Sequence, residues 1–107
     1  MISKLDKYQV KRFSRQIVLK NVGALGQKKI LNSKVLIIGM GGLGCPAAEF
    51  LIRAGVGFLG IVDHDKVDLS NIHRQSLFDS TDLNKPKVRV ALKKLNKINP
   101  KAKIYRV

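Results

Sequence analysis

This sequence has very few of the residues that build disulfide or zinc frameworks. Cysteine occurs once, at position 45, and tryptophan is absent. A lone cysteine cannot form an internal disulfide, which excludes a disulfide-stapled domain and agrees with a reducing compartment. Without a Cys-x-x-Cys pair we expect no zinc site and no other metal site. We interpret Cys45 as a small apolar side chain packed under a turn rather than as a reactive thiol.

Long apolar runs are also missing. No stretch approaches the length of a transmembrane helix, and the first residues lack the charged start and apolar core of a signal peptide. We therefore expect no membrane partner and a cytoplasmic location. A chain of 107 residues has room for one small domain.

Acidic residues are scarce and unevenly spread. Seven Asp and Glu stand against 21 Lys and Arg, a formal net charge of +14, and most of the acids fall between residues 63 and 82. Such an imbalance makes nucleic acids, acidic proteins and anionic ligands candidate partners. Scattered lysines usually form a solvated face, so we favour an anionic ligand or an acidic protein over a dedicated nucleic-acid site.

A glycine turn organises the chain. Residues 35–38 form an apolar run without polar alternation, which predicts a parallel strand covered on both faces. Gly39, Gly41 and Gly44 then fit G-x-G-x-x-G, and a helical stretch follows over 45–54. The N-terminal amides of that helix favour an anion above the glycines. Strand, turn and helix together predict a nucleotide-binding loop.

The chain after this helix repeats the pattern. Residues 58–62 predict a second buried strand that ends in Asp63, at about the twenty-residue spacing of an acid that hydrogen-bonds ribose. A polar loop follows, and Asn84 is expected to be the N-cap of a helix from Lys85 to about Ile98. Residues 103–107 begin a third strand.

The fold class predicted from this order is α/β. A Rossmann-like parallel sheet of about three strands with flanking helices, the first half of a doubly wound domain, is expected over 34–107, preceded by an N-terminal helical segment over 1–33. In that segment we expect one or two helical turns over 8–13, and a loop and short helix over 22–32 with Leu25 facing inward.

Several motifs, in this order and spacing, resemble the ThiF/MoeB/HesA family of adenylating enzymes, prokaryotic relatives of ubiquitin-activating enzymes. They extend from about Tyr8 to the last residue. An NAD-linked Rossmann domain would share the glycines and the acid but has no reason to carry the Ser70–Gln75 motif. The motifs are Arg12-Phe13-Ser14-Arg15-Gln16, Gly39-Met40-Gly41-Gly42-Leu43-Gly44, Gly55-Val56-Gly57, Ile61-Val62-Asp63-His64-Asp65, Asp68-Leu69-Ser70-Asn71-Ile72-His73-Arg74-Gln75 and Lys85-Pro86-Lys87.

The resemblance implies ATP-dependent adenylation. Enzymes of this family bind MgATP and activate the C-terminal glycine of a ubiquitin-like sulfur-carrier protein as an acyl adenylate, releasing pyrophosphate. Fixed cations offset the charge that builds when a carboxylate attacks the α-phosphorus. Arg15 would reach the ATP of the other subunit of a homodimer. Carried over by position, the nucleotide-binding residues are Gly39, Gly41, Gly42, Gly44, Asp63, Asp65, Asn71, Arg74, Gln75 and Lys87, and the catalytic ones are Arg15, Arg74 and Lys87.

Family members are more than twice as long as this chain. The aspartate that holds Mg²⁺, the cysteine pairs that bind zinc and the sheet that receives the carrier have no counterpart here. The resemblance therefore implies the ATP-binding half, inactive alone, with ATP and Mg²⁺ as its cofactors. A second copy or a complementing C-terminal half would be a partner, and we expect self-association or docking through the free edge of the first strand.

Other interpretations stay open. The chain could be a non-catalytic module that holds a nucleotide or a partner, a basic RNA-associated domain, since some relatives act on tRNA, or an NAD-binding domain. Individual residues also have plainer roles available. Arg74 could pair with one of the nearby aspartates, such as Asp65, Asp68 or Asp79, and Asn71 could cap a turn.

Overall fold

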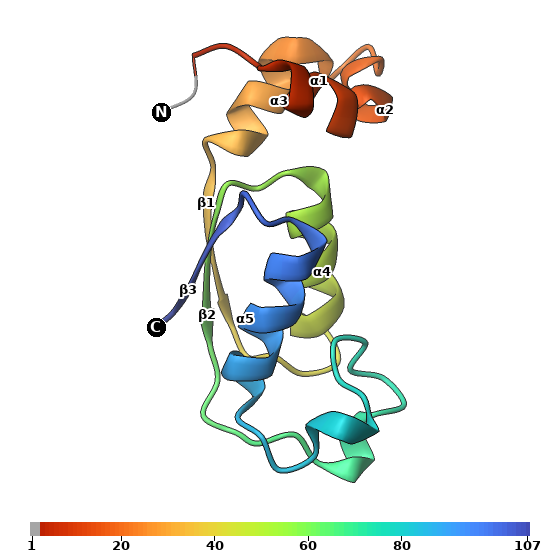
Figure 1. Ribbon diagram of the computed structural model, residues 1–107, viewed down its shortest axis with the longest axis vertical. Coiled ribbons are helices and arrows are strands. Elements are labelled where there is room, and N and C mark those ends of the chain that lie inside the picture. Colours follow the sequence, from red (N-terminus) through yellow and green to blue (C-terminus); the bar gives the residue numbers. More distant parts are fainter. Residues whose placement is uncertain (1–2) are drawn as a thin grey trace.

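The protein is built on a parallel sheet of three strands in the order β1-β2-β3 (Figure 1). In the computed structural model, which describes residues 3–107, β1 is Lys34–Ile38, β2 is Phe58–Val62 and β3 is Lys103–Arg106. The connecting helices α4, Gly44–Ala54, and α5, Lys87–Ile98, lie side by side on one face of this sheet (Figure 1). The predicted Rossmann-like α/β order is confirmed.

The core lies between this face and the two helices. Leu59 and Ile61 of the central strand are fully buried, as are Ile52 of α4 and Leu95 of α5. Along β2 buried and partly exposed residues alternate, as the two-residue period of a strand requires. This core fixes the ends of β1 and β2 relative to the starts of the two helices.

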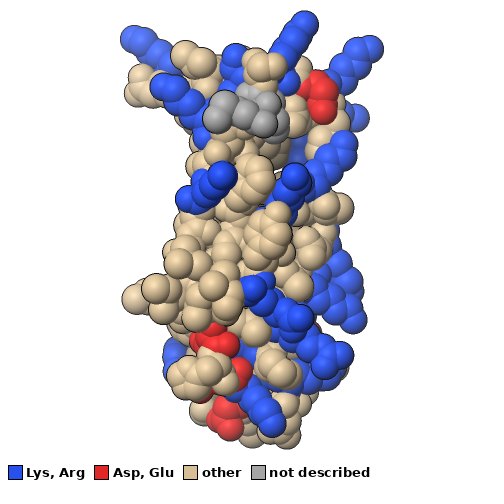
Figure 2. Space-filling view, turned by 90° about the vertical axis from the view of Figure 1, so that its left-hand side faces the viewer, with Lys and Arg blue, Asp and Glu red and all other residues tan. Residues whose placement is uncertain are grey.

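The other face of the sheet is open, so the expectation that β1 is covered on both faces is wrong. Leu36 is 55% exposed and Ile38 78% exposed. Leu36 pairs in register with Gly60, which pairs with the exposed Tyr105. Figure 2 shows this face, with few charged side chains in its central part. The reason is topological: both crossovers place their helices on the same face.

Three short helices cap the amino end of the sheet (Figure 1): α1, Lys7–Arg12, α2, Ser14–Ile17, and α3, Gly23–Leu31. The Gln16 side-chain Nε2 donates to Gln27 Oε1 at 2.8 Å and to the Ala54 carbonyl at 2.9 Å. Gln27 is fully buried, whereas Leu25 is 64% exposed, so the inward position predicted for Leu25 is wrong. Helix α3 begins at Gly23, so the loop expected within 22–32 lies earlier in the chain, over residues 18–22.

Glycine permits the closest contact at this end. A Cβ on Gly57 would lie 1.9 Å from the Leu31 carbonyl oxygen, a distance that no side chain allows. The chain after α4 therefore passes directly against the end of α3. The Gly55-Val56-Gly57 motif thus serves packing at the amino end of the sheet.

The segment before α5 differs from the prediction. Helix α5 begins at Lys87 with Pro86 as its N-cap, and Asn84 has a left-handed φ of 68°, so Asn84 is not the N-cap. The cause is pairing with an earlier segment. The amide of Val67 donates to the Lys85 carbonyl, and the amide of Asn84 donates to the Val67 carbonyl. These bonds hold the segment extended and delay the helix.

Two short 3₁₀ helices, Leu69–Asn71 and Ser80–Asp82, interrupt the polar loop between β2 and α5. Val67, Leu77 and Phe78 of this loop are buried in the core. Across residues 3–107, no helix has both the length and the apolar character needed to cross a bilayer.

Candidate functional site

The candidate site lies where β1 and β2 end, at the opposite end of the sheet from α1–α3 (Figure 1). The loop from Gly39 to Gly44 connects β1 to α4 there. A Cβ on Gly44 would lie 1.8 Å from the Gly39 carbonyl oxygen, so the loop can close this tightly only with glycine at position 44. This contact fixes the path of the loop over the start of α4.

Asp63 joins the end of β2 to the glycine loop. Its Oδ2 accepts a hydrogen bond from the Met40 amide at 2.7 Å, and its Oδ1 accepts one from the Asp65 amide at 2.7 Å. Burial alone would raise the pKa of this carboxyl group. The two amides, helped by the charge of Lys87, outweigh burial and lower the pKa below its usual value of 3.8. Asp63 is therefore an anion that positions the loop, with part of its surface facing the site.

Arg74 and Gln75 lie over the two central glycines. A Cβ on Gly42 would lie 3.4 Å from Arg74 Cδ, and a Cβ on Gly41 would lie 3.8 Å from Gln75 Nε2. The Arg74 guanidinium donates to the Ser70 carbonyl at 2.9 Å. Within residues 3–107, no carboxylate lies within 4.0 Å of it, so the aspartate pairing considered for Arg74 is not formed.

Gln75 carries an unused acceptor. The residue is 2% exposed, and its Oε1 is buried without a hydrogen-bond partner among the described residues. Buried amide oxygens are usually paired, because leaving one unpaired costs about 1–3 kcal/mol. The Gln75 side chain therefore lies at the loop with its Oε1 able to accept a further hydrogen bond.

Lys87 places a buried cation beneath the same site. The residue is 6% exposed, and its amide donates to the Asp65 carbonyl at 3.0 Å. The charge of Lys87 acts on the carboxylates of Asp63 and Asp68. In the described part of the chain, however, no carboxylate lies within 4.0 Å of its ammonium. The start of α5 thus holds a positive charge beside the loop without direct neutralisation.

Asn71 has a structural role that the sequence left open. Its Oδ1 accepts a hydrogen bond from the Asp68 amide at 2.8 Å, and the Asp68 side chain accepts from the Ser70 amide. This reciprocal capping starts the turn that leads to Arg74. Asn71 therefore caps the turn that carries the cation.

Asp65 lies beside the loop but is mostly exposed. Asp63, His64 and Asp65 bring ligand atoms within 4.8 Å of one another, a spacing that could hold a metal ion. Asp63 already accepts two amide hydrogen bonds, and His64 Nε2 lies 3.3 Å from Asp65 Oδ1. The hydrogen bonds of Asp63 and the contact between His64 and Asp65 account for the close spacing of these three side chains.

Arg15 does not join the other predicted residues. It belongs to α2, at the far end of the long axis from the glycine loop (Figure 1), where it is exposed. Gly39, Gly41, Gly42, Gly44, Asp63, Arg74, Gln75 and Lys87 gather at the loop. The sequence does not predict that the Met40 amide binds Asp63 or that the Ser70 carbonyl binds Arg74. Backbone groups are common to all residue types, so such contacts leave no pattern in the sequence.

Cys45 is expected to be inert in the native protein. Its side chain is fully buried, its Sγ lies 3.4 Å from the Met40 carbonyl oxygen, and burial raises its pKa to about 11. At pH 8 iodoacetamide should leave the native thiol unmodified and should alkylate it fully in denaturant, as mass spectrometry can measure. Rapid alkylation of the native protein at the denatured rate would contradict this interpretation.

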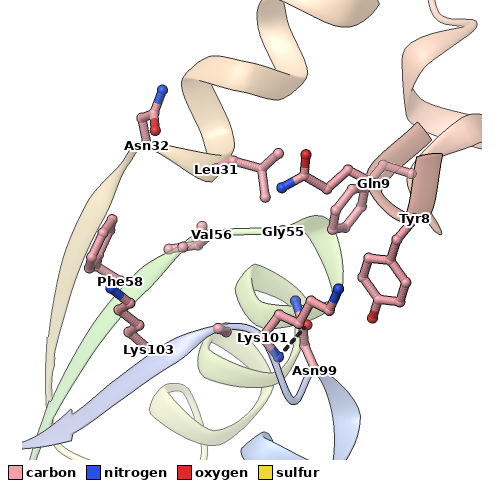
Figure 3. Close-up of a pocket in the computed structure, with 13 residues that line it drawn as sticks. Tyr8, Gln9, Leu31, Asn32, Gly55, Val56, Phe58, Asn99, Lys101 and Lys103 are labelled. Atoms are coloured by element: carbon pink, nitrogen blue, oxygen red, sulfur yellow. Dashed lines mark hydrogen bonds between the residues drawn. The ribbon is translucent and has the colours of Figure 1, made fainter. Parts of the chain in front are cut away.

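A separate hollow of about 250 Å³ lies at the amino end of the sheet (Figure 3). Tyr8, Phe13 and Phe58 line it, and the Lys101 ammonium lies 4.0 Å from the centroid of the Tyr8 ring. The residues of the glycine loop are not among those that line it. The hollow is therefore distinct from the candidate site.

Comparison with known proteins identifies relatives of this arrangement. A sequence profile described as the ThiF family matches residues 13–107. The chain is 52% identical over 89 residues to the sulfur carrier protein ThiS adenylyltransferase of Escherichia coli strain K12, a match that covers 83% of this chain and 36% of the relative. The curated relatives are much longer, since the matched part makes up only 22% to 36% of their length.

Solved structures agree with the fold. The crystal structure of PaaA superposes with a TM-score of 0.88 and 33% identity, over 99% of this chain and 35% of that one. The tRNA N6-threonylcarbamoyladenosine dehydratase TcdA of Escherichia coli, in complex with AMP, superposes with a TM-score of 0.87 and 25% identity, over 95% of this chain and 41% of that one.

Proposed function

The chain belongs to the ThiF family, and we propose on that premise that its glycine loop binds ATP for the adenylation of a ubiquitin-like sulfur-carrier protein. The relative from Escherichia coli strain K12 is named for that reaction on ThiS. This chain spans about a third of that relative, so the proposal assigns it the ATP-binding part of the enzyme.

One observation carries the proposal. Arg74 lies over the loop without a carboxylate partner, and Lys87 is buried beside it without one, among the described residues. Two fixed cations above and beside exposed backbone amides form a binding site for phosphate groups. Gly41 leaves space for a phosphate, because the nearest atom to its added Cβ is Gln75 Nε2 at 3.8 Å, whereas Arg74 lies against the corresponding position of Gly42.

Each site residue would have a separate role in adenylation. The carrier carboxylate attacks the α-phosphorus, an oxygen–phosphorus bond forms, and the bond to pyrophosphate breaks. Arg74 would hold phosphate oxygens by its planar fork, and Lys87 would supply a point charge beside them. Asp63 would accept from a ribose hydroxyl with the lone pairs that the Met40 and Asp65 amides leave unused. Mg²⁺ would arrive with ATP and further neutralise the phosphates.

Arg74→Gln is expected to weaken MgATP binding about 10- to 100-fold in calorimetry, because a charged hydrogen bond contributes about 1.5–3 kcal/mol. Arg106→Gln is the matched control, since Arg106 is an exposed arginine on β3, which is separated from β1 and its loop by β2 in the sheet. Its affinity should equal that of the parent. Equal affinity of the Arg74 variant, or tighter binding of NAD than of ATP by the parent chain, would contradict the proposal.

A second measurement separates catalysis from binding alone. Pyrophosphate exchange into ATP, measured with the carrier protein present, reports the reversal of adenylate formation. A protein that contains this chain, binds ATP and gives no exchange with any sulfur carrier would be a nucleotide-binding module.

A further inference from the structure

The outer face of α5 carries a row of cations that the ATP site does not use. Arg89, Lys93 and Lys97 are spaced four residues apart and are exposed. At 1.5 Å per residue the row rises about 12 Å along the helix. Lys85, just before the helix, is also exposed and continues it.

The row borders a hollow of about 390 Å³ between α5 and the 3₁₀ turn at Ser80–Asp82. Asp79 and Asp82 also line this hollow, but both are paired. The Lys94 ammonium lies 2.6 Å from Asp82 and 3.1 Å from Asp79. The Thr81 hydroxyl, and after it Lys94, lower the pKa of Asp79 to about 2, so Asp79 is an anion paired with Lys94 at neutral pH. The two acids share the single ammonium of Lys94, so this group carries one net negative charge against the four positive charges of the row.

The fold itself does not require these cations. The inner face of α5 buries Val90, Ala91 and Leu95, and this burial holds the helix on the sheet. Like charges four residues apart disfavour a helix. No carboxylate lies within 4.0 Å of any of the four cations, as far as the structure describes the chain. The row therefore costs helix stability and gains nothing from contacts within the protein.

We propose that Lys85, Arg89, Lys93 and Lys97 bind the phosphate backbone of a nucleic acid. A row of cations without carboxylate partners within 4.0 Å, beside a hollow, complements a polymer with regularly spaced negative charge. An acidic protein segment fits less well, because protein interfaces are anchored by apolar or aromatic side chains. The apolar side chain in this lining is Val90, which is 6% exposed.

The lining also indicates the mode of recognition. It offers no aromatic ring on which bases could stack and no Asn or Gln to read base edges. Contacts to phosphates position a nucleic acid without reading its sequence. The row therefore binds a backbone irrespective of sequence.

The test is fluorescence anisotropy with a labelled RNA hairpin and a DNA hairpin of the same sequence, at several salt concentrations. The row variant carries Lys85→Gln, Arg89→Gln, Lys93→Gln and Lys97→Gln. The control carries Lys4→Gln, Lys11→Gln, Lys20→Gln and Lys29→Gln, which removes four exposed charges from the N-terminal helical region. Both variants lose the same net charge, and circular dichroism checks that both are folded.

The row variant should lose at least 30-fold in affinity for the hairpin it binds. The slope of log K against log salt should fall in magnitude by about 3.6 for a duplex, or 0.9 for each phosphate neutralised. The control should change less than threefold, and MgATP affinity should be unaffected in both. Comparison of the affinities for the two hairpins shows whether the row binds RNA or DNA more tightly.

Two outcomes would overturn the proposal. Equal losses in the two variants would show that net charge alone drives binding. Row-dependent binding of poly-glutamate at least as tight as that of either hairpin would assign the row to an acidic protein. Because the ATP site is assayed separately, failure here is distinguishable from failure of the proposed function.

Discussion

Gly44→Ala should destabilise the protein by about 4 kcal/mol, the upper end of what single substitutions do. The new Cβ would lie 1.8 Å from the Gly39 carbonyl oxygen and 2.9 Å from its carbonyl carbon. Both atoms belong to the backbone at the end of β1, so no side-chain rotation relieves the overlap. The loop or the start of α4 must move, and the midpoint of denaturant unfolding reports the cost.

Gly41→Ala is the control in the same loop. A Cβ there has Gln75 Nε2 at 3.8 Å as its nearest neighbour, and Gly41 does not have a positive φ. The variant should keep its stability to within about 1 kcal/mol. Under the proposed function it should nevertheless lose ATP affinity, because the methyl group occupies space reserved for a phosphate. Equal stability of the two variants would contradict the loop geometry described above.

Lys87→Met should change affinity and stability in opposite directions. Methionine keeps the shape of the buried stem and removes a charge that no carboxylate within 4.0 Å balances in the described chain. Unfolding free energy should rise by about 1 kcal/mol, since a poorly compensated buried charge is costly. The dissociation constant of MgATP should rise about 30-fold as the charged contact is lost.

Lys66→Met tests whether any lysine at this end of the molecule would give the same result. Lys66 is exposed, and its segment pairs with Pro86 just before α5. Its replacement should leave both stability and MgATP affinity within error of the parent. If Lys87→Met lowered stability while affinity stayed constant, Lys87 would be a packing residue rather than part of a phosphate site.

The sequence predicts the strands, the two crossover helices and the glycine loop, because each depends on local residue types. Within one apolar run, Val35 and Ile37 pack against the core and are partly buried, whereas Leu36 and Ile38 point to the open face and are exposed. An apolar run cannot say which of its faces a helix will cover. That is decided by the direction of the crossovers, a property of the whole sheet.

The start of α5 shows a second limit. Asn84 and Pro86 are good residues for a helix start, and local propensity placed the helix two residues too early. Hydrogen bonds to Val67, about twenty residues upstream, override that propensity. Likewise, the sequence named Asp63, Arg74 and Lys87 as site residues but could not show that Met40 and Ser70 would orient two of them.

The tight packing of Gly57 against Leu31 lies at one end of the sheet, and the polar loop from residue 63 to residue 86 lies at the other. The loop is attached to the core by few buried side chains, chiefly Val67, Leu77 and Phe78. We therefore expect substitutions elsewhere in the loop to leave the amino end of the sheet unchanged. A library confined to the loop, with these three positions and the structural residues Asp63 and Asn71 fixed, is therefore expected to allow selection for new anions on an unchanged scaffold.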